Sequence, residues 1–409
     1  MPPKRKVPKK VREGLKAAKR VRDPLDAVIA SINKELKEGG SVGRGADISY
    51  MTWERIPSGS LGLDMIMGGG LPRGGLVQYK GEESSSKTSM ALASCALSQS
   101  RGEPVAWSAA EGFDKAWARK WGCFIPYSEA ELDLFVQKKV FRSMADARTR
   151  AEQYFEAFDG YADFFLAQAK SGPRLLEVTA RLQSTGQFGI VVVDSIGAII
   201  PDEADEKDIG EENRVGGNCK VVKQWVNKTR RAFNTIVPGD NGDTIHNKTC
   251  VIAINQMMAQ IGVYAPRGTR PPPEAGGGYA LKHGKDIDIR FNRGELLQES
   301  IDGRKLVYGR VIKAKADKNK TAPPYRETSW EFYFKDHPSE KHVKAGSIDQ
   351  VSEVFHWGVY YGLIEQAGAW YKINGVKHQG AEPAISALRE DPDVVAEMYQ
   401  TLVDMAAKQ

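Results

Sequence analysis

The sequence predicts an α/β fold whose core is a mostly parallel, twisted β-sheet with helices on both faces. Three observations predict it. The run Ile190–Asp194 is almost continuously apolar, as expected of a strand buried on both faces of a parallel sheet. Strand and helix patterns alternate through the middle of the chain. A Ser-rich loop, Gly81–Ser89, joins an apolar strand to a helix, which is the context of a phosphate-binding loop.

The charge is concentrated at the N-terminus. The 409 residues carry a net charge of +6, but residues 1–22 alone carry +9, so the remainder sums to −3. We expect 1–22 to be a disordered basic tail that contacts phosphate backbones or an acidic partner; a solvated solubility tail is the alternative. No apolar run could span a membrane, and no secretory signal follows the basic start. Four cysteines without C-x-x-C spacing predict reduced core residues of a cytoplasmic protein.

The elements follow in order after the tail. Residues 23–50 hold a helix over 25–38 with one apolar stripe, which needs a partner to bury it, and then a linker. The core is expected over 51–340. Its predicted strands cover 76–80, 104–109, 190–194, 249–255, 286–291, 306–314 and 329–334. Its predicted helices cover 87–100, 114–121, 173–185 and 216–236. Residues 341–409 are expected to form a small, mainly helical domain with a hairpin-like piece around Trp370–Val376.

The loop after the first of these strands has the residues of a nucleotide site. Backbone N–H groups of such a loop surround phosphates, Lys87 reaches the terminal ones, and the Thr88 hydroxyl is placed for Mg²⁺. Ser86 occupies the place of the usual glycine and crowds the loop. A Ser-rich turn that only caps a helix is the alternative. The predicted phosphate contacts are Gly81, Glu82, Glu83, Ser84, Ser85, Ser86, Lys87, Thr88 and Ser89.

Polar side chains end three of the predicted strands. Asp194 stands where a carboxylate would organise Mg²⁺. Glu111 could activate water, and the Gln256 amide could bind a γ-phosphate. For each of them the alternative is an exposed polar residue of a loop.

Two long irregular segments, 201–217 and 257–275, follow the strands that end at Asp194 and Asn255. The second contains Arg267 and Arg270 and leads into Gly277 and Gly278. The helix after the first segment places Gly216, Lys220, Lys223 and Asn227 on one face. These features suit a channel for single-stranded nucleic acid, and a solvated basic face is the alternative. Lys318 and Lys320 come after a strand, where a surface hairpin is the default interpretation.

The chain resembles the RecA-type recombinases of bacteria and their phages from about residue 27 to the C-terminus. The motifs that carry the resemblance are Pro57–Asp64, Gly68–Gly74, the phosphate loop, Ile190–Ser195, Ile254–Gln256, Lys318–Lys320 and Gly362–Tyr371. The last is the most specific, because it resembles the family's C-terminal domain. The resemblance implies a RecA-like P-loop ATPase core with an N-terminal oligomerisation helix at 23–50 and a DNA-binding domain at 341–409.

The resemblance also implies roles for single residues. Lys87, Thr88 and Asp194 would hold the phosphates and Mg²⁺, and Glu111 would activate water. Asp114 and Trp117 match residues that contact and stack on adenine. Gln256 would sense the γ-phosphate.

Further implied roles concern DNA and the neighbouring protomer. Residues 208–215 and 257–275 resemble the family's two DNA-binding loops, and Val215 and Ile261 match apolar side chains inserted between base triplets. Lys318 and Lys320 resemble a pair that reaches the neighbouring protomer's ATP.

The implied function is a single-stranded-DNA-dependent ATPase, with ATP and Mg²⁺ as cofactors. It would polymerise as a helical filament and exchange strands with a homologous duplex in DNA repair and the SOS response, with single-strand-binding and loader proteins as partners. Because Ser86 replaces glycine, the alternative is a filament or recombination mediator that binds ATP without hydrolysing it. Three other departures are the shorter spacing between Glu111 and Asp114, His283 in place of Phe, and an insertion at about 125–160.

Overall fold

The computed structural model describes residues 54–201, 217–238, 244–258, 274–301 and 303–407, with positions 27, 28, 31 and 34 of an N-terminal helix. Residues 1–54 and 55–409 are two separate compact units, and only the second is described below. The basic tail, most of the 25–38 helix, and the predicted DNA contacts Val215, Ile261, Arg267 and Arg270 lie outside the described residues.

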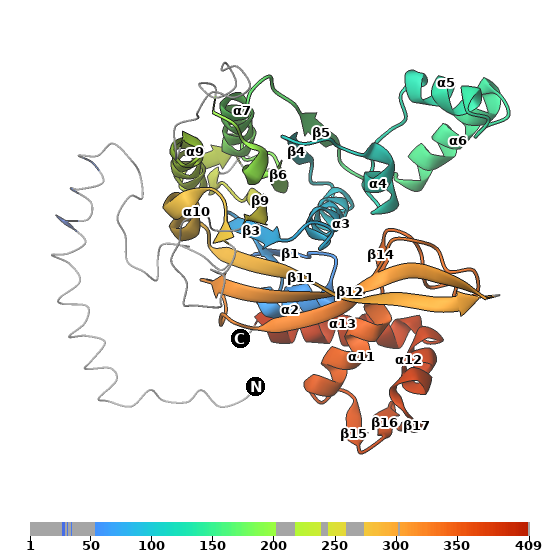
Figure 1. The fold of residues 1–409 in the computed structure, drawn as a ribbon. Helices are drawn as coiled ribbons and strands as arrows, with labels where there is room; N and C mark the ends of the chain where they lie inside the picture. Colours follow the sequence, from blue (N-terminus) through green and yellow to red (C-terminus); the bar gives the residue numbers. More distant parts are fainter. Residues whose placement is uncertain are drawn as a thin grey trace, which may run out of the picture. The chain divides into compact units, whose positions relative to one another are not determined.

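The described part of the chain contains a central sheet of ten strands (Figure 1). The parallel half is formed by β11 (Ile287–Ile301), β3 (Leu76–Gly81), β9 (Cys250–Met258), β6 (Ile190–Asp194), β4 (Val105–Ala109) and β5 (Phe164–Ala167), in that order. β12 (Arg304–Asn319), β13 (Glu327–Tyr333) and β14 (Ser347–Ile348) extend the sheet beyond β11 by antiparallel pairing, and β10 (Glu274–Ala275) pairs with β9. Outside this sheet, β1 (Arg55–Ile56) pairs with β2 (Leu71–Pro72), and β7 (Ile236–Pro238) pairs with β8 (Thr244–His246). The sheet confirms the predicted fold class.

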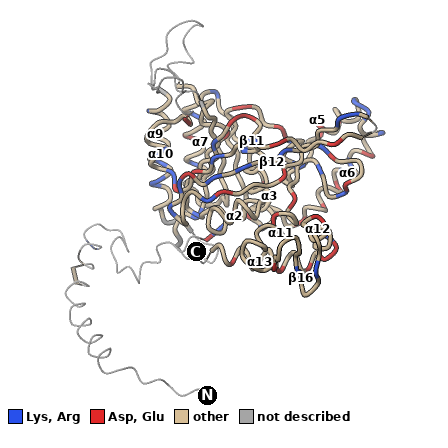
Figure 2. The backbone as a smooth tube through the Cα atoms, turned by 60° about the horizontal axis from the view of Figure 1, so that its bottom comes forward, with Lys and Arg blue, Asp and Glu red and all other residues tan. Residues whose placement is uncertain are grey.

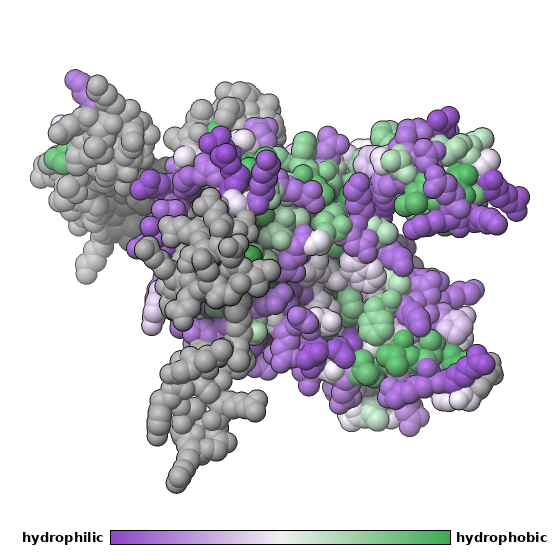
Figure 3. Space-filling view, turned by 45° about the horizontal axis from the view of Figure 1, so that its top comes forward, coloured by the Kyte–Doolittle hydropathy of each residue, from purple (hydrophilic) through white to green (hydrophobic). Residues whose placement is uncertain are grey.

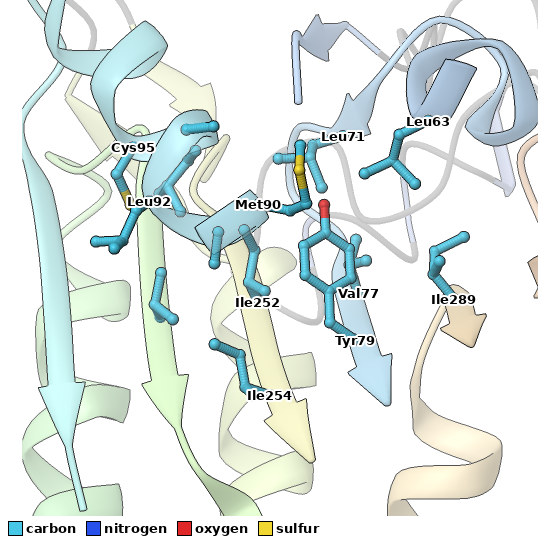
Figure 4. Packing of buried hydrophobic residues seen from close by; sticks show 14 of the residues in the cluster. Leu63, Leu71, Val77, Tyr79, Met90, Leu92, Cys95, Ile252, Ile254 and Ile289 are labelled. Carbon is cyan, nitrogen blue, oxygen red and sulfur yellow. The ribbon is translucent and has the colours of Figure 1, made fainter. Parts of the chain in front are cut away.

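Helices cover both faces of the sheet because successive strand residues point to opposite sides. On one face, α3 (Lys87–Gln99) places Met90, Leu92 and Cys95 against Val77, Tyr79, Ile252 and Ile254 (Figure 4). On the other face, α7 (Gly172–Ser184), α9 (Gly217–Phe233) and α10 (Gly278–Gly284) pack against Val193, Val251 and Ala253. The core therefore lies in two layers, one on each side of the β6 and β9 strands.

The predicted elements differ from the observed ones at two places near the sheet's antiparallel edge. β11 and β12 run well beyond the predicted 286–291 and 306–314, since past Phe291 they leave β3 and pair only with each other, and their exposed residues give no apolar signal. Lys318 and Asn319 belong to β12, so they do not follow a strand as predicted.

Several short elements were not predicted, and two of them show the physical reason. β5 is a four-residue edge strand, and α2 (Leu61–Met67) is a seven-residue helix whose residues are all buried, so it has no polar side to reveal a helical period.

The C-terminal region packs on the core through α2. α11 (Gln350–Tyr360), α12 (Ala381–Arg389) and α13 (Pro392–Ala407) surround the small antiparallel sheet of β15 (Glu365–Ala367), β16 (Trp370–Ile373) and β17 (Val376–Gln379). The hairpin-like piece around Trp370–Val376 thus supplies the central strand and one edge strand of a three-stranded sheet. Leu402 and Ala406 of α13 join Leu61 and Met65 of α2 in one apolar cluster.

Residues within the predicted insertion form two helices, α5 (Glu129–Gln137) and α6 (Met144–Ala157), which project from the sheet beyond α4 (Lys115–Lys120) (Figure 1). No helix in the described part of the chain is long and apolar enough to cross a membrane.

Candidate nucleotide-binding site

The phosphate-loop candidate is a tight turn between β3 and α3. Gly81 is required there, because a Cβ at this position would lie 2.3 Å from the Phe291 carbonyl oxygen of the adjacent strand β11. Ser84 and Ser86 adopt left-handed backbone conformations with φ of 56° and 68°. Such angles favour glycine, so Ser86 keeps the backbone shape of the residue it replaces while carrying a side chain. Its Oγ is buried without a hydrogen-bond partner in the structure.

Lys87 lies within the curl of this loop. Its Nζ donates to the Glu82 carbonyl oxygen at 2.5 Å and contacts Ser85 Oγ at 3.4 Å. Burial lowers the pKa of Lys87, while the negative charges of Asp194 and Glu111 act in the opposite direction. Because its two hydrogen-bond partners are neutral oxygens, the lysine brings a positive charge to the N-terminus of α3, where anions are favoured.

Thr88 and Asp194 meet at the start of α3. The Thr88 hydroxyl donates to Asp194 Oδ2 at 3.3 Å. Burial, and then the charge of Glu111, raise the pKa of Asp194 to about 6. A hydroxyl and a carboxylate suit Mg²⁺, which takes one or two protein oxygens and completes its shell with phosphate and water. In keeping with that, no cluster of three or more His, Cys, Asp or Glu able to hold a metal occurs among the residues that the structure describes.

Glu111 and Gln256 come together from the ends of β4 and β9. Gln256 Nε2 donates to Glu111 Oε1 at 3.4 Å, and the Ser195 hydroxyl donates to the same oxygen. Ser195 was not among the predicted site residues; its position directly after Asp194 at a strand end was the available signal. Lys87, Thr88, Glu111, Asp194 and Gln256 thus form one polar group at the carboxyl ends of neighbouring parallel strands, where ligands bind in such sheets.

The predicted adenine contacts lie on α4. Asp114 caps this helix, accepting from the N–H groups of Ala116 and Trp117 at 2.8 and 3.0 Å. Trp117 Nε1 donates to Ser89 Oγ at 3.3 Å, so the indole stands next to the start of α3. Its ring also contacts Trp121 and Phe332.

The two predicted lysines lie at different levels of the sheet: Lys320 is at the opposite end of the strands from the loop, whereas Lys318 pairs with Asp288, level with Gln78 and three residues before Gly81. Lys320 donates its backbone N–H to Asp286, which in turn pairs with Leu76 at the beginning of β3, whereas the loop begins at Gly81. Five strand residues separate the two levels, about 17 Å. Lys318 Nζ donates to the carbonyl oxygens of Lys282 and His283 at 3.0 and 3.1 Å, at the end of α10. Lys318 lines a pocket that also contains Glu82 of the loop, whereas Lys320 is held away from the loop of its own chain.

The described DNA-binding candidates lie around α9 and α10. Lys220 and Lys223 are exposed on α9, while Val222, Trp225 and Val226 on its other side are buried. Gly277 and Gly278 begin α10 with φ of +94° and +67°. Lys220 and Lys223 lie on the face of the sheet opposite to α3.

The strand order, with a phosphate loop after β3 and polar side chains at the ends of β4, β6 and β9, defines a phosphate-loop α/β protein. The RecA N-terminal domain family matches residues 23–128 and 157–337, and the RecA C-terminal domain family matches 352–407. The chain belongs to the RecA family, and it is a recombinase that acts in DNA recombination and repair.

Named relatives agree over nearly the whole chain. Protein RecA of Nocardioides sp. is 30% identical over 383 residues, covering 93% of this chain and 90% of the relative. Protein RecA of Acidiphilium cryptum is 29% identical and covers 92% of both chains. A crystal structure of the RadB recombinase is 21% identical with a TM-score of 0.40, covering 68% of this chain and 96% of that one.

Proposed function

We propose that this recombinase is a single-stranded-DNA-dependent ATPase that polymerises as a helical filament on single-stranded DNA and carries out homologous pairing and strand exchange. The observation that carries the proposal is the position of Lys320, at the far end of the strands from the phosphate loop of the same chain. A site that needs both the loop and Lys320 is complete only when a second copy supplies one of them. Such head-to-tail contacts generate helical polymers when the rotation between copies does not close a ring.

The loop side of the composite site would hold ATP and Mg²⁺. Lys87 and the N–H groups at the start of α3 would bind the phosphates, and Thr88 with Asp194 would bind the metal, directly or through water. ATP supplies the transferable γ-phosphate, and Mg²⁺ neutralises its charge. Asp194 would bind the metal in its ionised form, which burial and then the charge of Glu111 disfavour in the protein without ligands.

Glu111 is placed to take a proton from water. Its carboxylate is exposed, and one of its oxygens is oriented by Ser195 and Gln256. Gln256 leads directly into the segment 259–273, so a change in what its amide contacts would be transmitted to the proposed DNA loop. This supports a link between nucleotide state and DNA affinity, since a ligand biases a state only through contacts that differ between states.

A complementation experiment tests the composite site. Lys87→Ala removes the loop lysine and Lys320→Ala removes the lysine from the other end of the strands, and each variant alone should lose at least about 100-fold in DNA-stimulated ATP turnover. In an equal mixture, about a quarter of the interfaces join an intact loop to an intact Lys320, so turnover should recover to about that fraction of the parent. No recovery in the mixture, with both variants still assembling on DNA, would contradict action between copies.

A second candidate function is a filament or mediator that binds ATP without turning it over. The observation that favours it is Ser86, whose buried hydroxyl stands in the phosphate loop with a left-handed backbone. Measured turnover of the parent protein with and without single-stranded DNA separates the two functions, because the second predicts filaments on DNA and no phosphate release.

A further inference from the structure

The helix pair α5–α6 is a unit of this chain that the family does not account for. The match to the RecA N-terminal domain stops at residue 128 and resumes at 157, and α5 and α6 occupy 129–157. The unit projects away from the sheet, on the side opposite to α9 and α10 (Figures 1 and 2). Its role is therefore open to assignment from its own residues.

The projection has its own hydrophobic core. Phe124 stacks on Tyr154 and Phe158 at ring distances of 5.9 and 5.6 Å, and Tyr127 contacts Tyr154 at 5.2 Å. Farther out, Phe135 of α5 meets Phe141 at 5.5 Å. Such aromatic pairs stabilise beyond their buried area.

Both helices also begin with well-formed caps. Ser128 and Glu131 form a capping box at the start of α5, and Ser143 Oγ accepts from the Asp146 N–H at the start of α6. The loop between the helices is held at both ends, because the Lys138 N–H donates to the Leu134 carbonyl oxygen at the end of α5 and Ser143 caps α6.

Positive charge gathers on this loop, which we call the basic tip (residues 138–142). Lys138, Lys139 and Arg142 are exposed, as is Val140 at 60% (Figure 3 shows the mixed surface of this unit). Among the residues that the structure describes, none of the three cations forms an ion pair. Arg142 faces Asp146, but that carboxylate is already paired with Arg150 at 3.3 Å.

Outside the basic tip, the projection (residues 129–157) is acidic: it carries two arginines against six carboxylates, a net charge of −4. Arg119 pairs with Glu131 and Arg148 pairs with Glu129. The cations of residues 138–142 therefore form a local basic patch at the end of a unit that is otherwise acidic. Figure 2 shows the blue of these cations at the far end of the α5–α6 projection.

We propose that the basic tip binds the phosphate backbone of duplex DNA. Three unpaired cations within five residues match a polymer that carries one charge per about 1.7 Å of its axis. Single-stranded DNA is bound largely by stacking on free aromatic rings, and Phe141, the aromatic of the tip, is already packed on Phe135. The tip also lies apart from α9, so it would serve a second DNA molecule. This role rests on the proposed function, in which the recombinase engages a duplex as well as a single strand.

The experiment compares how strongly duplex binding depends on salt in the parent protein and in a variant of the basic tip. Binding is measured by the fluorescence anisotropy of a labelled 30-base-pair duplex. The variant Lys138→Gln/Lys139→Gln/Arg142→Gln removes three charges, so the slope of log affinity against log salt should fall by about 2.7. Between 50 and 200 mM salt, the parent should therefore lose about 40-fold more affinity than the variant. The variant Lys138→Arg/Lys139→Arg retains charge and should keep the parent slope.

A matched control carries the same charge change on the β11–β12 hairpin, as Arg304→Gln/Lys305→Gln/Lys313→Gln. An unchanged slope in the tip variant, or an equal fall of the slope in the control variant, would overturn the proposal. If the slope is unchanged and the tip instead captures an acidic peptide, the basic tip would be assigned to protein binding. Urea unfolding confirms that the variants are folded. Single-stranded-DNA-stimulated ATP turnover of the parent is measured separately, so failure of the proposed function is distinguished from failure of the tip assignment.

Discussion

Asp286 holds Lys320 within its own chain, with Lys320 Nζ 3.3 Å from Asp286 Oδ1. The same oxygen accepts from Arg230 of α9 at 2.6 Å, and the other carboxylate oxygen accepts from the Leu76 N–H at 3.0 Å. Asp286 is nearly fully buried, whereas Lys320 is half exposed. One carboxylate therefore joins the lysine proposed to act on a neighbour's nucleotide to the helix proposed to bind DNA.

Loss of the Asp286 charge should release Lys320. In Asp286→Asn we expect ATP turnover without DNA to rise about fivefold, because a half-exposed ion pair contributes about 1 kcal/mol at most. The measurement is steady-state phosphate release with and without single-stranded DNA. Glu327→Gln, which breaks the exposed pair with Lys315, is the control and should leave both rates unchanged. If the DNA-free rate of the variant equals that of the parent, Asp286 does not restrain Lys320 from reaching a neighbouring copy.

Replacing Ser86 with glycine should increase both the free energy of unfolding and the rate of ATP turnover. The left-handed backbone at φ 68° costs a non-glycine residue about 1 kcal/mol, and glycine removes this cost. Glycine also increases the conformational entropy of the unfolded chain, which offsets part of the gain. We expect Ser86→Gly to gain about 0.5 kcal/mol in urea unfolding and to raise ATP turnover. Ser84→Gly is the matched control: its φ is 56° but its side chain is exposed, so it should gain stability without raising turnover.

Asp194 makes the stability of the nucleotide-free protein depend on pH. Its pKa in the fold is about 6, above the ordinary 3.8, because the protonated form is favoured by burial and by nearby Glu111. Its stabilising contribution is therefore complete below pH 3.8 and is lost as pH rises through about 6. We expect Asp194→Asn to exceed the parent in stability at pH 7 by up to about 3 kcal/mol and to converge with it near pH 4. Urea unfolding across this range checks the sign, and exposed Asp393→Asn should follow the parent.

Glu353 of α11 fixes the C-terminal region to the core. It is buried, its Oε1 accepts from Ser60 Oγ and the Gly62 N–H, and its Oε2 accepts from the Leu61 N–H. Glu353→Ala leaves these donors of the first turn of α2 buried and unpaired. We expect a loss of about 2 kcal/mol in the free energy of unfolding. Exposed Glu382→Ala on α12 should change it by less than about 0.5 kcal/mol.

The sequence predicted those parts of the fold whose pattern is local. Ile190–Asp194 was found with its observed bounds because an apolar strand ending in a carboxylate is visible within five residues. The phosphate loop was visible for the same reason.

Features that depend on contacts between distant segments could not be predicted. Nothing near Asp286 indicates that it meets Arg230, 56 residues away, and Glu353 meets Leu61 across 292 residues. The resemblance to the RecA family supplied a role for Lys318 and Lys320, but only the strand register shows how far each of them lies from the loop of its own chain. The left-handed angle of Ser86 likewise belongs to the folded loop and has no signature in composition.

The side chain of Arg119 has a mechanical consequence. It extends from α4, which carries Trp117, and donates to the carbonyl oxygens of Ile125 and Pro126 at 2.7 and 3.1 Å, while its guanidinium lies over the Tyr127 ring. These contacts connect α4 to the segment that leads into α5. α6 has fourteen residues and is about 21 Å long, so a small rotation at the base of the projection becomes a larger displacement at its outer end. A tilt of α4 by a few degrees would therefore move the outer end of the projection through roughly 2 Å.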